Sequence, residues 1–217
     1  MPQNHKLSRR LTLKSWSLAV LSAAAGARPA LADDASAHAH HDHAAHMAKA
    51  ASTATRRSVA NNSPAPVRMI RQDGVSAPFA AALDDGRPVL LNFIFTSCTA
   101  ICPVTSQVFS RVIDQLGAHR AQVNVVSVSI DPEYDSPARL EAYAQRFGGR
   151  REAWSLFTGS SADSIAVQKS FAAYQGDKMN HVPVTFLRRA PGQPWVRLDG
   201  FATPEVLIAE LHGMLGH

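Results

Sequence analysis

Hydrophobic positions fall into short runs and stripes that predict alternating strands and helices from about Val67 to the end of the chain. The apolar run at residues 89–95 predicts a strand buried on both faces, as in the middle of a parallel sheet. Apolar residues then recur at helical spacing as far as Leu116, and Gly117 predicts the end of that helix. A strand followed directly by a helix is therefore expected around the middle of the chain.

The remaining elements follow from the same reasoning. Strands are expected at residues 123–130, 154–157, 184–188 and 195–198, and helices from Ser136-Pro137, from Ser161 to about Tyr174, and from Thr203-Pro204. Alternating strands and helices that end in a hairpin and a helix predict an α/β fold, with a central mixed sheet flanked by helices on both faces.

The first 32 residues have the pattern of a cleavable signal peptide and are not expected to belong to the fold. Basic residues precede an apolar stretch at residues 16–25, and Ala30-Leu31-Ala32 supplies small residues for cleavage. The apolar stretch is too short to span a bilayer, which needs about 20 residues, so no stable membrane span is expected. Arg9-Arg10 lies in a segment that resembles the twin-arginine export motif, and ordinary Sec export remains open. Either route predicts a periplasmic protein.

Removing the signal peptide also removes the positive charge. The 217-residue chain has 22 Lys and Arg and 17 Asp and Glu residues, and five of the basic residues but none of the acidic ones lie in residues 1–32. The mature protein is formally neutral, so its charge offers no argument for nucleic-acid binding.

Residues 33–66 are expected to form a flexible tether between the signal peptide and a domain at residues 67–217. Ala, Ser, Thr, Asn and His dominate this stretch, which has few large apolar residues to bury. Within it lies a cluster of five histidines: His38, His40, His41, His43 and His46. The cluster suits loose collection of copper, nickel or zinc, or is simply a solvated spacer.

The only two cysteines, Cys98 and Cys102, lie between the strand at 89–95 and the following helix. Unpaired backbone N–H groups and the helix dipole favour thiolates there, so both cysteines are expected to be reactive. Three residues separate them, against the two usual in thioredoxin-type exchange. At helical spacing their Cβ atoms would lie about 5–6 Å apart, beyond the roughly 3.5–4.5 Å of a disulfide, a gap that a metal ion bridges more easily. Because the loop can bend, a redox pair, a metal pair, a local disulfide and two inert core thiols remain open.

A pair of thiolates selects Cu(I) or zinc and leaves room for a third ligand. His181 is the best candidate, because it lies shortly before the strand at 184–188, which a sheet could bring beside the cysteine loop. Two sulfurs and one imidazole would hold Cu(I) and would tolerate Cu(II) with one more ligand. A single histidine at the start of a strand is more often structural, so the residues alone leave its role open.

Three segments in order resemble the Sco/SenC family: Phe95–Pro103, Ser129–Pro137, and His181 followed by Thr185-Phe186-Leu187. The resemblance covers about residues 67–217, which is essentially the whole predicted domain. The resemblance implies a thioredoxin-like fold. It also implies action in assembly of the dinuclear copper centre of cytochrome c oxidase.

By the same resemblance, copper is bound by Cys98, Cys102 and His181. The protein would then be a metallochaperone, not a turnover enzyme, and its recipient would be a cuproprotein, the copper-bearing subunit of the oxidase. The alternative is a thiol–disulfide oxidoreductase acting on cuproprotein cysteines, in which Cys98 attacks, Cys102 resolves, and a thiol reductant such as a periplasmic thioredoxin restores the pair. A redoxin-type peroxidase has no further signature in the sequence.

The chain departs from the family pattern in two respects. Family members often carry an N-terminal membrane helix, where this chain has the signal pattern and the histidine-rich tether, and Asn180 stands where the family commonly has Asp. Val182-Pro183 is similar to the proline that thioredoxins place beside their active site, which keeps thiol chemistry open. Asp131 and Asp135 are expected to act mainly as turn and cap residues, with support of the site by Asp135 as the alternative.

Overall fold

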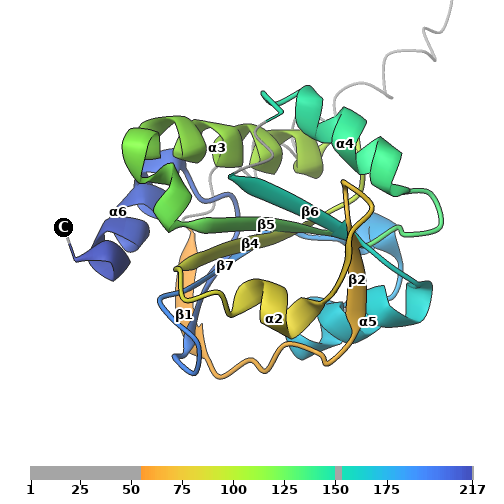
Figure 1. Ribbon diagram of the computed structural model, residues 1–217, viewed down its shortest axis with the longest axis horizontal. Helices are drawn as coiled ribbons and strands as arrows, with labels where there is room; N and C mark the ends of the chain where they lie inside the picture. The colour runs from red at the N-terminus through yellow and green to blue at the C-terminus, as the bar shows by residue number, and fades with distance from the viewer. Residues whose placement is uncertain (1–54, 150–152, 217) are drawn as a thin grey trace, which may run out of the picture. The chain divides into compact units, whose positions relative to one another are not determined.

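An eight-stranded mixed sheet organises the part of the chain that the computed structural model describes, residues 55–149 and 153–216 (Figure 1). The strand order across the sheet is β1-β8-β7-β4-β5-β6-β2-β3. Its strands are β1 (Arg56–Ala60), β2 (Arg68–Arg71), β3 (Ser76–Pro78), β4 (Val89–Ile94), β5 (Asn124–Ser129), β6 (Trp154–Thr158), β7 (Val184–Arg188) and β8 (Trp195–Asp199). Strands β4, β5 and β6 are parallel and all other pairings are antiparallel, which confirms the predicted mixed sheet.

Helices cover both faces of this sheet, also as predicted (Figure 1). They are α2 (Phe79–Leu83), α3 (Ile101–Leu116), α4 (Pro137–Gln145), α5 (Ser161–Ser170) and α6 (Pro204–Leu215), with 3₁₀ turns η1 (Gly117–Gln122) and η2 (Lys178–Asn180). A hydrophobic core lies on each face of the sheet, and alternate residues of β4 contribute to one core or the other. Leu90 and Ile94 pack with apolar residues of α3, α4 and α6, whereas Leu91 and Phe93 pack with those of α2 and α5.

The expected helix starts are confirmed by their capping geometry. The Ser136 hydroxyl accepts the backbone N–H of Arg139 at 3.3 Å, and Pro137 follows at the first helical position. Helix α5 ends at Ser170, earlier than the predicted Tyr174. The chain turns there because Ala172 adopts a left-handed conformation (φ 50°), which brings the Ala173 N–H to the carbonyl of Gln168 at 2.8 Å.

The domain begins before the expected boundary at Val67. Residues 56–60, assigned from the sequence to the tether, form β1, which pairs with β8 along its whole length. The side chains of β1 are mostly exposed, so the strand has no hydrophobic run that could reveal it. Backbone pairing and two ion pairs, Arg56 to Asp199 and Arg57 to Glu210, hold it at the edge of the sheet.

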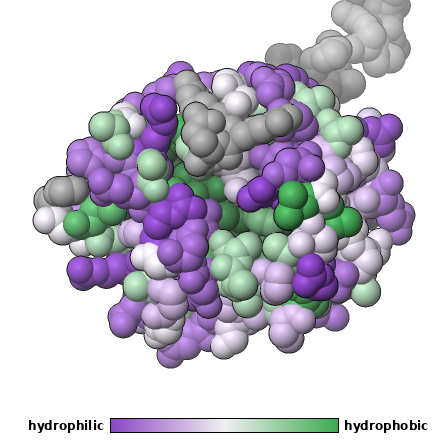
Figure 2. Space-filling view, in the orientation of Figure 1, coloured by the Kyte–Doolittle hydropathy of each residue, from purple (hydrophilic) through white to green (hydrophobic). Residues whose placement is uncertain are grey.

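Large apolar side chains are mostly held between the sheet and its helices. On the face of the molecule in Figure 2, polar side chains predominate and hydrophobic ones show in small groups. No helix among residues 55–149 and 153–216 is long and apolar enough to cross a membrane. The predicted signal peptide and the five-histidine cluster lie outside the described residues.

Candidate functional site

The cysteine loop joins the buried central strand β4 to helix α3, as the sequence predicts. Strand β4 ends at Ile94, Cys98 lies in the connecting loop, and Cys102 is the second residue of α3. Both cysteines are free thiols, with Cys98 half-buried and Cys102 fully buried. One thiol is therefore reachable from solvent, and the other lies beneath it in the core.

Hydrogen bonds shift the pKa values of the two cysteines in opposite directions. The Cys98 sulfur accepts the backbone N–H of Cys102 at 3.4 Å, and the N–H groups of Ala100 and Ile101 at the start of α3 also point to it. Hydrogen bonding from the Cys102 thiol is the largest cause that lowers the pKa of Cys98, to about 5, and the backbone donors add to it against the effect of burial. The sequence therefore predicts a stabilised thiolate correctly at Cys98.

For Cys102 the expectation of a favoured thiolate is wrong. Its thiol donates to the Cys98 sulfur, and this bond together with burial raises the pKa of Cys102 well above its ordinary value. The Cys102 sulfur in turn accepts the backbone N–H of Phe95 at 3.4 Å. At neutral pH the pair consists of a Cys98 thiolate and a Cys102 thiol.

His181 lies in the segment between η2 and β7 and is buried. Its Nε2 atom is 3.1 Å from the backbone carbonyl oxygen of Phe93 in β4. Because that oxygen can only accept, Nε2 carries the proton and Nδ1 keeps its lone pair. Burial lowers the pKa of His181, so the imidazole is neutral at neutral pH, the form that binds metals.

His181 and Cys102 are anchored to the same end of β4. The carbonyl of Ile94 accepts the N–H of Ile130 on the β5 side, so the backbone groups of its neighbours Phe93 and Phe95 face the β7 side. The Phe93 carbonyl accepts from Nε2 of His181, and the Phe95 N–H donates to the Cys102 sulfur. Yet His, Cys, Asp and Glu side chains of the described residues form no three-membered group that could hold a metal ion. The structure therefore does not bring His181, Cys98 and Cys102 together as a ligand group, although all three lie near the same end of β4.

Asp135 supports the cysteine loop from the segment between β5 and α4. This buried carboxylate accepts the backbone N–H of Thr96 at 3.1 Å and the hydroxyls of Thr96 and Ser129, the latter at 2.6 Å. Burial is the main cause that raises its pKa. The cap of α4 is Ser136, so Asp135 does not act as the cap residue expected from the sequence, and its contacts match the alternative of a residue that supports the site.

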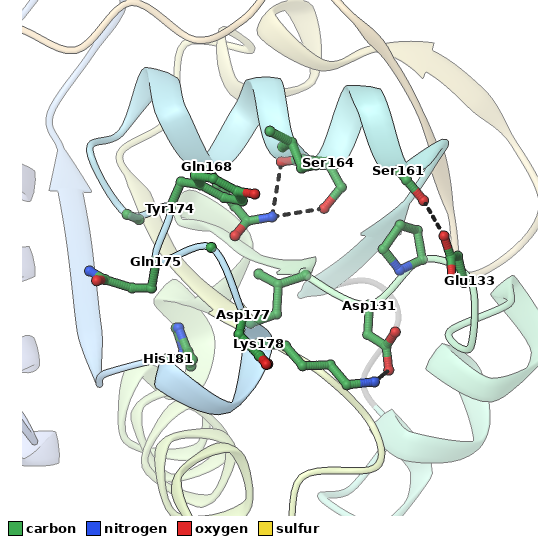
Figure 3. Close-up of a pocket in the computed structure, with 15 residues that line it drawn as sticks. Asp131, Glu133, Ser161, Ser164, Gln168, Tyr174, Gln175, Asp177, Lys178 and His181 are labelled. Atoms are coloured by element: carbon green, nitrogen blue, oxygen red, sulfur yellow. Dashed lines mark hydrogen bonds and ion pairs between the residues drawn. The ribbon is translucent and has the colours of Figure 1, made fainter.

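A cavity of about 550 Å³ is lined in part by His181 (Figure 3), and neither cysteine lines it. Its walls come from the loop after β5, from α5, and from the segment between α5 and β7. Lys178 reaches across it to Asp131, with its Nζ atom 2.6 Å from a carboxylate oxygen. Sequence reasoning missed Lys178, because nothing in the local pattern links it to a residue 47 positions earlier.

Comparison with known proteins gives a consistent family. The model of the SCO1/SenC family matches residues 61–216. The chain is 32% identical over 110 residues to an SCO1 protein homolog of Bacillus subtilis, which is 50% of this chain and 56% of that protein. It is 34% identical over 91 residues to a mitochondrial SCO2 homolog of Bos taurus, covering 41% of this chain and 33% of the relative. The matches thus span about half or less of these relatives.

Solved structures extend the likeness over the whole domain. The copper-bound ScoI structure from Bradyrhizobium japonicum is 25% identical, with a TM-score of 0.58 over 71% of this chain and 99% of the other. BsSco is 26% identical, with a TM-score of 0.61 over 72% and 95%. It is described as a member of the Sco family of cytochrome c oxidase assembly proteins in which a disulfide switch was identified. The fold of this chain is therefore thioredoxin-like in the manner of these proteins.

Proposed function

The chain belongs to the SCO1/SenC family, and from this premise we propose that it is a copper carrier that holds Cu(I) between Cys98, Cys102 and His181. It delivers the metal to a cuproprotein during assembly of the copper centre of cytochrome c oxidase. One observation carries the proposal: a thiolate–thiol pair and a neutral buried imidazole are anchored to the same end of β4. Carriage by ligand exchange makes copper the cargo, so no turnover chemistry is required.

The chemistry of these three side chains fits Cu(I). Soft sulfur ligands select Cu(I), and Cys98 offers a thiolate without further proton loss at neutral pH. Cys102 has to release its proton on binding, so loading releases one proton for each copper bound through it. The neutral imidazole of His181 would complete the set through Nδ1, which keeps its lone pair while Nε2 donates to the Phe93 carbonyl. The copper-bound B. japonicum ScoI structure supports this assignment.

The N-terminal signal pattern supports a function outside the cytoplasm. Export through residues 1–32 would bring the domain into the periplasm, where a copper centre of a membrane oxidase is accessible. The histidine cluster at residues 38–46 would then be exported together with the domain. BsSco, described as a member of a family of cytochrome c oxidase assembly proteins, supports this setting.

A second candidate, thiol–disulfide oxidoreductase, is favoured by the unequal cysteines. The Cys98 thiolate attacks a target disulfide, forms a mixed disulfide, and releases one target thiolate, which takes up a proton. Cys102 then loses its proton and attacks the Cys98 sulfur, which releases the second target thiolate and leaves a Cys98–Cys102 disulfide. The target gains two electrons, and an external dithiol has to restore the pair. The disulfide switch identified in BsSco supports this chemistry.

A Cu(I) competition titration under anaerobic conditions tests the carrier proposal. The protein is the full reduced chain in which the five clustered histidines are changed to serine, here named the histidine-depleted chain: His38→Ser, His40→Ser, His41→Ser, His43→Ser and His46→Ser. A shortened chain that begins at Ala60 is unsuitable, because it would lack most of β1. The same full-length chain with His181→Ala should bind Cu(I) at least about tenfold more weakly, since loss of a residue that only supports a ligand already costs that much.

The matched control is His212→Ala, which removes an exposed histidine of α6. It should leave the affinity unchanged. Weak binding in the parent chain, or tight binding that His181→Ala does not alter, contradicts the three-ligand carrier. Reduction of a small aromatic disulfide that proceeds equally in the parent and His181→Ala chains would then favour the oxidoreductase.

A further inference from the structure

Lys178 connects two loops that flank the candidate site. It lies in η2, three residues before His181, and the backbone N–H of His181 donates to the Lys178 carbonyl at 3.2 Å. Its ammonium group is 2.6 Å from the carboxylate of Asp131 and lies 5.8 Å from the centre of the Phe95 ring. The lysine thus contacts the loop after β5, as Figure 3 shows for Asp131, and also the start of the cysteine loop at Phe95.

The acidic partner of this ion pair is enclosed and fixed. The Asp131 side chain is 11% exposed and that of Lys178 is 40% exposed, so the carboxylate is largely shielded from solvent. Asp131 is held by its backbone, because its N–H donates to the Ser129 hydroxyl at 3.0 Å and its carbonyl accepts from Tyr134 and Asp135. A fixed carboxylate gives Lys178 a firm anchor.

The anchor is coupled to the cysteines through Asp135. The loop that holds the Asp131 carboxylate also carries Asp135, whose carboxylate holds Thr96 at the start of the cysteine loop. Three segments are therefore linked in series: the His181 segment, the loop from Asp131 to Asp135, and the cysteine loop. Among the described residues, the ion pair that joins the first segment to the second is Lys178–Asp131.

We infer that Lys178 is a positioning residue for His181: its ion pair with Asp131 keeps the His181 segment beside the cysteine loop, so that the imidazole reaches both sulfurs with little loss of freedom. The inference rests on the proposed function. The reason is entropic, since a segment already restrained in the metal-free protein has less conformational freedom to lose when His181 becomes a ligand. Lys178 itself touches no metal.

The test is a double-mutant cycle in the histidine-depleted chain, with Cu(I) as the probe. Lys178→Met keeps an unbranched side chain of similar size and removes the charge, and with it the ion pair to Asp131 and the cation–π contact with Phe95. It should weaken Cu(I) binding about three- to fivefold when His181 is present, the range of a partly enclosed ion pair, and have no effect in the His181→Ala background. Lys178→Arg keeps the charge and should restore the parent affinity.

Lys169→Met is the matched control, because Lys169 also lies over an aromatic ring, that of Tyr174 at 5.2 Å, but pairs with no carboxylate in the described residues. It should leave Cu(I) affinity unchanged. Exchanging the partners, Asp131→Lys with Lys178→Asp, should recover the loss caused by either change alone.

A second readout needs no copper. In the metal-free protein, the Nε2 proton of His181 should exchange with solvent faster in Lys178→Met than in the parent, as measured by NMR of the imidazole, while the urea midpoint stays at that of Lys169→Met. Equal losses of Cu(I) affinity with and without His181, tighter binding in Lys178→Met, or unchanged imidazole exchange would overturn the inference. If His181→Ala alone has no effect on affinity, the proposed third ligand fails instead, so the two failures are distinguishable.

Discussion

Removing the Cys102 thiol should raise the pKa of Cys98. The Cys98 pKa is about 5, against 9.0 for an unperturbed thiol, and its largest cause is the hydrogen bond from Cys102. In Cys102→Ala that donor is lost, while the backbone N–H groups of Ala100 and Ile101 remain. The pKa should therefore rise without returning to the ordinary value.

The size of the rise follows from the strength of a hydrogen bond to a charged acceptor. Such a bond contributes about 1.5–3 kcal/mol, and one pKa unit corresponds to about 1.36 kcal/mol. Since Cys98 is half-buried, solvent replaces part of the lost bond, and the lower part of this range applies. The pKa of Cys98 in Cys102→Ala is then expected at about 6–7.

The assay is the rate of alkylation by iodoacetamide as a function of pH, followed together with the ultraviolet absorbance of the thiolate. Parent protein should show a midpoint near 5 from Cys98, and Cys102→Ala a midpoint shifted upward. The matched single-thiol control, Cys98→Ala, should react slowly up to alkaline pH, because burial raises the pKa of Cys102. A midpoint near 9 in the parent, or the same midpoint in the parent and Cys102→Ala, would refute the assigned charges.

Three further outcomes are expected from urea unfolding. Asp135→Ala leaves the donors of Thr96 and Ser129 unpaired and should lower the free energy of unfolding by about 2–4 kcal/mol. The control Asp73→Ala, which removes an exposed ion pair, should lower it by less than about 1 kcal/mol. Equal losses in the two variants would contradict the role of Asp135 in supporting the cysteine loop. Tyr143→Phe removes the 2.8 Å hydrogen bond between the Tyr143 hydroxyl of α4 and the buried Ser106 hydroxyl, and should lower the free energy of unfolding by about 1–2 kcal/mol. An unchanged free energy of unfolding would show that this hydrogen bond is not formed. Deleting residues 56–60 should lower the urea midpoint and promote self-association, because the backbone groups of β8 that pair with β1 become unpaired. An unchanged midpoint would show that β1 does not stabilise the domain, and would favour the boundary at Val67.

The central elements of the fold could be predicted from the sequence because burial leaves a clear pattern there. Strand β4 is apolar at five of its six positions and buried at all of them, and the stripe of α3 has helical spacing. Strand β1 left no such pattern, because its side chains are mostly exposed and its stability comes from backbone pairing with β8. Pairing between strands far apart in the chain has no local signal.

Prediction of the site was limited by contacts that involve the backbone or distant residues. The sequence predicts the position of the cysteines between strand and helix. It does not predict that the N–H groups at the start of α3 lower the pKa of Cys98 alone, while the Cys102 thiol donates a hydrogen bond to the Cys98 sulfur. The partner of His181 is a backbone carbonyl, which no side-chain pattern reveals. The pair formed by Lys178 and Asp131 depends on how the loop after β5 meets the loop before β7 at the end of the central strands, which is set by the tertiary fold.

X-ray absorption at the copper edge tests the central claim most directly, using the Cu(I)-loaded histidine-depleted chain. The three-ligand carrier predicts two sulfur ligands and one imidazole nitrogen, and loss of the imidazole signal in His181→Ala but not in His212→Ala. A copper environment of sulfur alone, or an imidazole signal that survives His181→Ala, would contradict the proposed site.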